Sequence, residues 1–175
     1  MKIAYADPPY IGFADRYPEG RGVDHLELFA RLERGYDGWA LSTNVPALKA
    51  TLALAPEGVR IAAWVQPFSN YALNCDPLYG WEPVIYRPAK RPNRKGNRPR
   101  DWILAHKPLR RETVMMGQKS SEFAFWIFEL THAAPGDVFA DLYPGSGAVG
   151  RAWTRWELSK RMQRVLPIGS AIGEP

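Results

Sequence analysis

Cysteine is nearly absent from this sequence, which has one such residue, Cys75, among 175. A single cysteine excludes a disulfide within these residues and any zinc site built mainly from cysteines. The three histidines are far apart in the sequence and show no metal-ligand spacing, so we expect no metal ion. We therefore expect a protein of a reducing compartment, the cytoplasm.

Long apolar runs are also missing. None approaches the ~20 residues that span a bilayer, and residues 1–6 lead directly into an expected strand without the pattern of a signal peptide. We therefore expect no membrane association. The hydrophobic fraction of 46% and the aromatic fraction of 13% indicate a globular chain. We predict a single domain over residues 1–175, large enough to bury a substantial core.

Acidic residues are scarce in one basic segment, residues 87–113, of a chain whose net charge is +5. Between Arg87 and Arg111, Asp101 is the only acid. Basic clusters bind polyanions by releasing counterions, so we predict an insert that contacts the phosphates of nucleic acid. A solvated loop is the alternative. The candidate nucleic-acid-binding residues are Lys90, Arg91, Arg94, Lys95, Arg98, Arg100, Lys107, Arg110 and Arg111.

Apolar segments of strand length and helix length alternate along the chain. We expect strands at residues 2–6, 38–43, 59–65, 82–86 and 138–142. We expect helices at residues 24–34, 46–55, 121–132 and 151–161, and typical helix-start residues stand at Asp24, Pro46 and Ser120 or Ser121. This alternation with short connections predicts an α/β fold, with a mainly parallel sheet flanked by helices on both faces.

The first of two short motifs is Asp7-Pro8-Pro9-Tyr10, which follows the first expected strand. Neither proline has an N–H group, and each restricts its own φ angle and the conformation of the residue before it. The motif therefore predicts a stiff loop that holds a carboxylate, two free carbonyls and a phenol ring in one arrangement. A turn that merely ends the strand is the alternative.

The second motif, DLYPGSG at residues 141–147, lies between the last expected strand and the helix that follows it. Glycines at a strand-to-helix turn let a ligand approach the backbone, and the helix start offers free N–H groups. A tight turn without a ligand is the alternative.

Together the two motifs resemble those of the DNA amino-methyltransferases that use S-adenosylmethionine (SAM). The catalytic motif precedes the glycine motif, which resembles the permuted β class of that family. Residues 37–44 and 81–86 are similar to its other segments, and so is Gly117-Gln118-Lys119-Ser120, although Ser120 stands where a proline usually follows the lysine. The resemblance covers nearly the whole chain, and it implies a circularly permuted, Rossmann-like methyltransferase fold.

The resemblance implies transfer of a methyl group from SAM to the exocyclic N6 of an adenine flipped out of double-stranded DNA. Asp7 and the carbonyl of Pro8 would accept the two N6 hydrogens, and Tyr10 would stack on the base with Phe13 or Tyr17. An acid at position 7, rather than serine, favours adenine N6 over cytosine N4. The implied catalytic residues are Asp7, Pro8, Pro9 and Tyr10.

The same resemblance implies a set of residues that bind the SAM cofactor. Asp141 and the glycine turn would contact its methionine part, and Tyr143 would line its pocket. The implied cofactor-binding residues are Ala6, Asp7, Lys119, Asp141, Leu142, Tyr143, Gly145, Ser146 and Gly147. A cytosine-N4 enzyme, an RNA methyltransferase and an inactive nucleic-acid-binding subunit are the alternatives.

This sequence departs from the family after its last expected helix. There the family has a further strand that ends in an acid for the ribose hydroxyls, and no acid stands at that place here. The departure implies a truncated cofactor domain whose pocket a homodimer or a partner subunit would complete. A short target-recognition region is expected of a compact enzyme of the restriction-modification type, such as one encoded by a phage.

Overall fold

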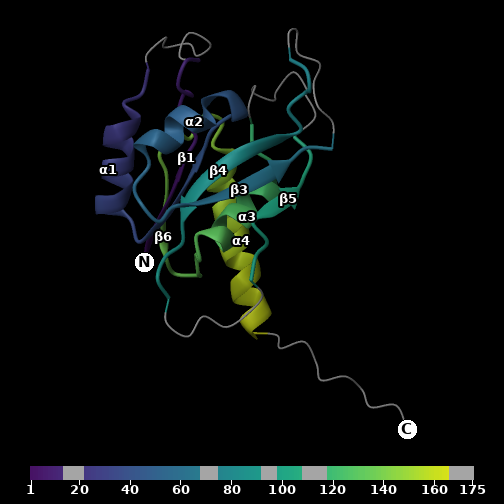
Figure 1. Ribbon diagram of the computed structural model, residues 1–175. Helices are drawn as coiled ribbons and strands as arrows, with labels where there is room; N and C mark the ends of the chain where they lie inside the picture. Colours follow the sequence, from purple (N-terminus) through teal and green to yellow (C-terminus); the bar gives the residue numbers. More distant parts are fainter. Residues whose placement is uncertain (14–21, 68–74, 92–97, 108–117, 166–175) are drawn as a thin grey trace.

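The computed structural model describes residues 1–13, 22–67, 75–91, 98–107 and 118–165, with side chains up to residue 163 (Figure 1). The strands are β1 (Lys2–Ala6), β2 (Gly38–Ser42), β3 (Arg60–Val65), β4 (Trp81–Arg87), β5 (Trp102–Leu104) and β6 (Val138–Asp141). The helices are α1 (His25–Gly35), α2 (Val45–Leu54), α3 (Ser121–Leu130) and α4 (Ala148–Val165). No helix in these ranges is both long enough and apolar enough to cross a membrane.

The strands form one six-stranded sheet in the order β5-β3-β4-β2-β1-β6. β1 pairs in parallel with β2 and β6, and β3 pairs in parallel with β5. β4 is antiparallel to both of its neighbours, so five strands share one direction and β4 runs against them. β4 is the exception to the predicted parallel order, and an antiparallel pair such as β3 and β4 needs no crossover helix.

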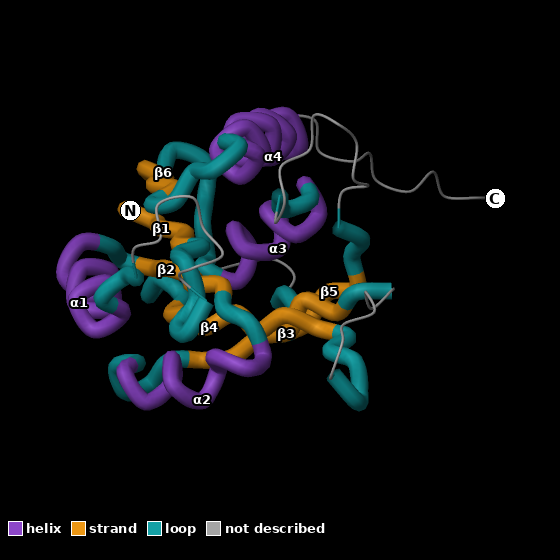
Figure 2. The backbone as a smooth tube through the Cα atoms, turned by 90° about the horizontal axis from the view of Figure 1, so that it is seen from above, coloured by secondary structure: helices purple, strands orange, loops and turns teal. Residues whose placement is uncertain are grey.

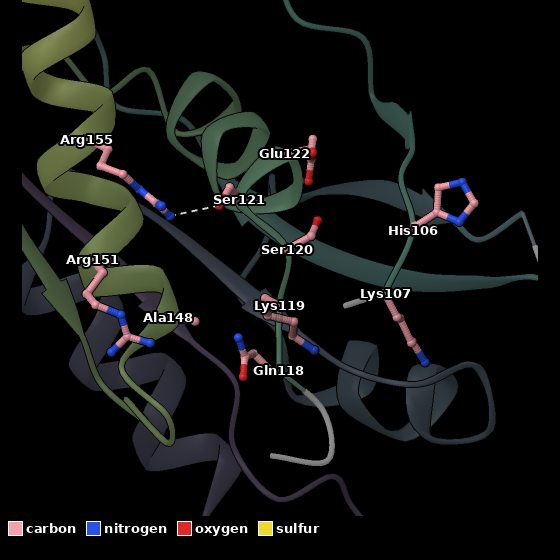
Figure 3. A pocket seen from close by; sticks show the side chains of 10 residues that line it. All are labelled: His106, Lys107, Gln118, Lys119, Ser120, Ser121, Glu122, Ala148, Arg151 and Arg155. Atoms are coloured by element: carbon pink, nitrogen blue, oxygen red, sulfur yellow. Dashed lines mark hydrogen bonds between the residues drawn. The ribbon is translucent and has the colours of Figure 1, made fainter. Parts of the chain in front are cut away.

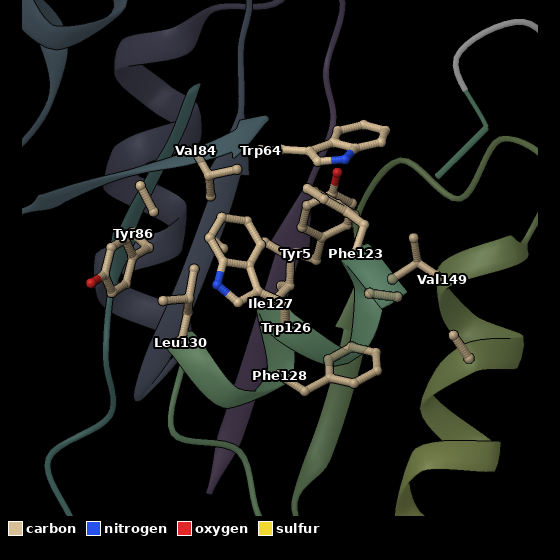
Figure 4. Close-up of a cluster of buried hydrophobic side chains, with 14 of the residues drawn as sticks. Tyr5, Trp64, Val84, Tyr86, Phe123, Trp126, Ile127, Phe128, Leu130 and Val149 are labelled. Atoms are coloured by element: carbon tan, nitrogen blue, oxygen red, sulfur yellow. The ribbon is translucent and has the colours of Figure 1, made fainter. Parts of the chain in front are cut away.

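The sheet is the middle of three layers, with α1 and α2 on one face and α3 and α4 on the other (Figure 2). Neighbouring residues of a strand point to opposite faces. On β1, Tyr5 therefore packs on the α3 side, whereas Ala4 and Ala6 pack on the α1 side. Aromatic rings from α3, among them Phe123 and Phe128, fill the space between the sheet and α4 (Figure 4).

Two predicted helix starts, at Asp24 and at Ser120, are confirmed by side chains that cap the helix. The side chain of Asp24 accepts a hydrogen bond from the Glu27 N–H, and Ser120, rather than Ser121, caps α3 in the same way. α4 was predicted too short, because it begins at Ala148, directly after the glycine turn.

The sequence pattern does not predict β5. This strand lies inside the basic segment, residues 87–113, for which an insert or a loop is predicted. Three residues are too few to show a period, and pairing with β3 is what makes them a strand. The expected fifth strand is consequently β6.

Strand direction places both motifs at one edge of the sheet. The carboxyl ends of β1, β2 and β6 lie at this edge, which we call the carboxyl edge, and the first residues of β4 lie there too because β4 runs the other way. The loop after β1 and the turn after β6 therefore start side by side.

Candidate active site

The Asp7-Pro8-Pro9-Tyr10 loop leaves β1 at the carboxyl edge. Pro8 is buried, and the other three residues are half-buried. The Tyr10 hydroxyl donates a hydrogen bond to Oδ1 of Asp7 at 3.2 Å, and the Phe13 N–H donates to the Tyr10 carbonyl at 2.9 Å. The loop thus holds the carboxylate and the phenol ring together, as the motif predicts.

Lys119 approaches the same carboxylate from the segment before α3. Its Nζ lies 3.2 Å from Oδ2 of Asp7 and 3.5 Å from Oε2 of Glu82, and its side chain is only 5% exposed. The ammonium also lies 5.4 Å from the ring centre of Trp64 and 5.7 Å from that of Phe123. Burial would lower the pKa of Lys119, but the nearby anionic groups, Asp7 foremost, raise the pKa well above its ordinary value.

Glu82, near the start of β4, links Lys119 to Lys107. Nζ of Lys107 lies 2.6 Å from Oε1 of Glu82. Burial would raise the pKa of Glu82, yet the two ammonium groups hold the pKa below its ordinary value. Asp7, Lys119, Glu82 and Lys107 therefore form a row of alternating charges, which we call the charge row. No sequence pattern predicts Glu82 as a site residue, since nothing local in the sequence places it beside Asp7.

Tyr5 and Ser42 form a buried polar contact next to this row. Their hydroxyl oxygens are 2.7 Å apart and join the ends of β1 and β2. Burial raises the pKa of Tyr5 well above its ordinary value, and the Asp7 carboxylate adds to the shift. Tyr5 is therefore a neutral phenol beneath the site.

Asp141 is the last residue of β6 and lies opposite Tyr5 of β1 in the strand register. The Leu142 N–H donates to the Tyr5 carbonyl at 2.9 Å, which keeps the strands together as far as the motif. Oδ1 of Asp141 is buried and has no hydrogen-bond partner among the described residues. Burial raises the pKa of Asp141 to about 6; the Tyr143 N–H opposes the shift and the charge of Asp7 adds to it. The charge of Asp7 thus acts on Asp141, and one acceptor atom of Asp141 has no partner among the described residues.

The turn after Asp141 needs glycine at two positions. Gly145 has a φ of 47° and Gly147 a φ of 71°, a left-handed backbone that side chains disfavour. The Gly147 N–H donates to the Pro144 carbonyl at 2.6 Å, and the Ser146 carbonyl accepts from Nη1 of Arg151 at 2.8 Å. The backbone thus folds back on itself in a tight turn just before α4.

The predicted nucleic-acid-binding residues that the structure describes do not all lie together. Arg91 is paired with Asp137, which also accepts from the Met1 ammonium at 2.8 Å, at the sheet edge opposite Asp7. The five residues of β1 separate these edges by roughly 15 Å. Lys107 is the one described member of the predicted set that belongs to the charge row, through its contact with Glu82. Lys90, Arg98 and Arg100 are exposed elsewhere, and Arg94, Lys95, Arg110 and Arg111 lie outside the described residues, as does Tyr17.

A cavity of about 450 Å³ opens beside Lys119, between the first turns of α3 and α4 (Figure 3). Arg151 and Arg155 reach into it from α4, and Lys107 lies on the opposite side. The other residues that line it are His106, Gln118, Lys119, Ser120, Ser121, Glu122 and Ala148.

The sheet order and the layers define a Rossmann-like fold of the methyltransferase type. The crystal structure of the M1.HpyAVI-SAM complex is similar, with a TM-score of 0.60 and 20% identity over 90% of this chain and 78% of that one. The crystal structure of M1.HpyAVI has a TM-score of 0.61 and 19% identity over 89% and 76%. No protein-family model and no curated protein sequence matches the chain.

Proposed function

We propose that this protein is a SAM-dependent DNA methyltransferase that acts on the N6 amine of adenine. The observation that carries the proposal is that two aspartates in different surroundings lie at one edge of the sheet, at the ends of the paired strands β1 and β6. Asp7 stands in the rigid proline loop, and Asp141 stands before the glycine turn. A methyl transfer needs two such places side by side, one for the amine and one for the methyl donor.

The residues after β6 fit a cofactor of the SAM kind. Oδ1 of Asp141 is a buried acceptor without a described partner, suited to a cationic ligand group. At Gly145 nothing lies within 4 Å of the place that a Cβ would take, so the backbone there is open to close approach. SAM supplies a methyl group on a sulfonium, and M1.HpyAVI, whose fold this chain shares, forms a complex with SAM. We assign cofactor binding to Ala6, Asp7, Lys119, Asp141, Leu142, Tyr143, Gly145, Ser146 and Gly147.

The loop after β1 supplies the acceptors for the amine. The Asp7 carboxylate and the Pro8 carbonyl would each accept one hydrogen of an exocyclic amine, which turns the nitrogen lone pair toward the methyl donor. The buried ammonium of Lys119, 3.2 Å from Oδ2 of Asp7, holds this carboxylate in position at the end of β1. Tyr10, held by Asp7, would stack on the base.

The decisive experiment incubates the protein with tritiated SAM and duplex DNA, then digests the DNA and identifies the labelled nucleoside. We expect N6-methyladenine. Asp7→Ala should abolish transfer while calorimetry still detects cofactor binding. Asp101→Ala, which changes an exposed acid before β5, is the matched control and should keep full activity.

Each other outcome selects a different function. Labelled N4-methylcytosine, or label in RNA only, would replace the proposed substrate by another within the same chemistry. DNA binding without transfer and without cofactor binding would indicate an inactive nucleic-acid-binding subunit. Activity that appears only with a second copy or a partner chain would support a cofactor pocket shared between subunits, which stays a prediction.

A further inference from the structure

Exposed apolar side chains gather on β3 and β5, the last two strands at one end of the sheet. In the parallel register of these strands, Trp102 lies opposite Ala63 and Leu104 lies opposite Val65. Opposite residues of paired strands share a face of the sheet, and so do alternate residues of one strand. One face of β3 and β5, which we call the β3/β5 face, is therefore formed by Ile61, Ala63, Val65, Trp102 and Leu104. Trp102 and Ile61 are each 44% exposed, and Leu104 is 58% exposed.

The β3/β5 face is on the same side of the sheet as α1 and α2. Trp64 is buried in the core on the α3 side, so its neighbours Ala63 and Val65 point to the opposite side. The core beneath α1 and α2 takes its buried strand residues from β1, β2 and β4, and none of its described members lies on β3 or β5. These two strands lie at the end of the sheet away from α1 (Figure 2). The exposed side chains of the β3/β5 face are consequently open to a partner.

Basic side chains border this face. The guanidinium carbon of Arg100 lies 5.4 Å from the ring centre of Trp102, and Arg98 is exposed two residues earlier. Asp101 is the only acid in the described stretch that contains β5. After β5 the chain leads to Lys107, whose ammonium belongs to the charge row. The β3/β5 face therefore has a positive border and is continuous with the candidate active site.

We propose that the β3/β5 face binds unpaired bases of the substrate strand, with Trp102 as the surface on which a base stacks. The inference rests on the proposed function, and it adds to it a preference for DNA whose bases are locally unpaired. An exposed indole beside a guanidinium gives a base a flat apolar surface, and the arginines supply contacts to phosphates. The face thus combines the two contacts that single strands need.

The geometry favours unpaired bases over a closed duplex. In a duplex each base is covered by its stacked neighbours, and only base edges are accessible, through the grooves. A major groove admits a helix or a two-stranded ribbon, whereas Trp102 and Leu104 lie on the face of a six-stranded sheet. Unpaired bases, in contrast, have open faces that stack on aromatic side chains.

A protein partner is the competing occupant of an apolar sheet face. The positive border favours nucleic acid, because it complements the charge of phosphates. The position of β5 favours it too, since this strand leads directly to Lys107 at the carboxyl edge, where the amine acceptor Asp7 lies. One strand of nucleic acid could therefore contact both places.

The test measures binding of three fluorescein-labelled probes by anisotropy. They are a single-stranded DNA, an abasic strand of the same length, which keeps the phosphates but lacks the bases, and the fully paired duplex. Trp102→Ala should weaken binding of the single strand roughly tenfold and leave binding of the abasic strand unchanged. Its effect on the duplex should be less than about twofold. Trp102→Phe should restore most of the affinity, because a phenyl ring also stacks on bases.

Leu104→Ala and Leu158→Ala form a matched pair of variants. The two side chains are 58% and 60% exposed, but Leu158 lies on α4, on the other side of the sheet. Leu104→Ala should weaken binding of the single strand, by less than Trp102→Ala does, whereas Leu158→Ala should leave it unchanged. Calorimetric SAM binding should be the same in all these variants as in the unsubstituted protein, which verifies that they are folded.

Three results would overturn the inference. Unchanged affinity of folded Trp102→Ala for the single strand would show that this face does not hold bases. An equal loss for the abasic strand or for the duplex would show that the contact is not stacking on unpaired bases. A dimer that Trp102→Ala dissociates in sedimentation experiments, with strand binding unchanged, would assign the face to a second copy.

The proposed function fails in a different way. If the unsubstituted protein neither binds nor methylates DNA, the proposed function and this inference are both wrong. Methyl transfer by the unsubstituted protein, together with any of the three results above, would contradict this inference alone.

Discussion

The ammonium of Lys119 lies 3.2 Å from the carboxylate of Asp7, although more than half of the chain separates the two residues. Asp7 follows β1, and Lys119 stands just before the Ser120 cap of α3. The contact exists because α3 packs on the sheet face to which Tyr5 points, so that its start lies at the carboxyl edge. It fixes the Asp7 carboxylate beside the start of α3.

Replacing Lys119 should destabilise the protein and impair transfer. Lys119→Met keeps the length of the side chain but leaves Asp7 and Glu82 without their shared cation. Loss of one partner of a buried ion pair lowers the free energy of unfolding by about 3 kcal/mol, and urea denaturation measures it. Lys160→Met is the control, because its surface pair with Glu129 should contribute less than about 1 kcal/mol. Equal stability of the Lys119→Met variant and the unsubstituted protein would contradict this interpretation.

Asp141 should make stability depend on pH. Its pKa is about 6 in the folded protein, above the ordinary 3.8, so folding favours the protonated carboxyl. The resulting stabilisation is fully present below the ordinary pKa and is lost as the pH rises through the folded pKa. Asparagine does not titrate, so the stability of Asp141→Asn relative to the unsubstituted protein should rise between about pH 4 and pH 7. Thermal unfolding at several pH values measures this difference, and a pH-independent difference would contradict the shifted pKa.

The same substitution should have the opposite effect on cofactor binding. A cationic group of SAM is stabilised by the ionised Asp141, so SAM affinity of the unsubstituted protein should rise as the pH passes through about 6. Asp141→Asn should bind SAM more weakly and lose this dependence. Calorimetric titration at pH values on either side of the pKa tests it. Undiminished binding by the variant would mean that Asp141 does not contact the cofactor.

Two glycines three residues apart should respond to alanine in opposite directions. At Gly147, φ is 71° and an added Cβ would lie 2.9 Å from Nη1 of Arg151. We expect Gly147→Ala to lower stability by about 1 kcal/mol and to weaken SAM binding. Gly150 lies inside α4 with nothing within 4 Å of an added Cβ, so Gly150→Ala should raise stability by up to about 1 kcal/mol. Chemical denaturation compares the two variants, and stabilisation by Gly147→Ala would contradict the strained turn.

Arg91 should matter for folding more than for nucleic acid. Burial would raise the pKa of Asp137, but the Met1 ammonium and the Arg91 guanidinium hold the pKa below its ordinary value. Arg91→Ala removes one of these partners and should cost about 1–2 kcal/mol of stability, with DNA affinity unchanged. Lys90→Ala, next to it and exposed, is the control and should leave stability unchanged. Loss of DNA affinity in the Arg91 variant without loss of stability would instead support the role predicted from the sequence.

The sequence alone was sufficient where chemistry is local. Asp24 and Ser120 predicted helix starts because a capping side chain bonds to the backbone three residues away. The two prolines after Asp7 and the glycines after Asp141 predicted special loops at strand ends, because these residues restrict or free the backbone by themselves. The α/β class followed from the alternating apolar segments.

Tertiary structure decided which of these pieces meet. Parallel pairing of β1 with β6 puts Asp7 and Asp141 at one edge, and the reversed direction of β4 brings Glu82 there as well. The basic segment, continuous in sequence, is divided between opposite edges, with Arg91 at one and Lys107 at the other. Strand pairing and ion pairs join residues that are far apart in the chain. Local propensity and spacing therefore cannot predict these contacts.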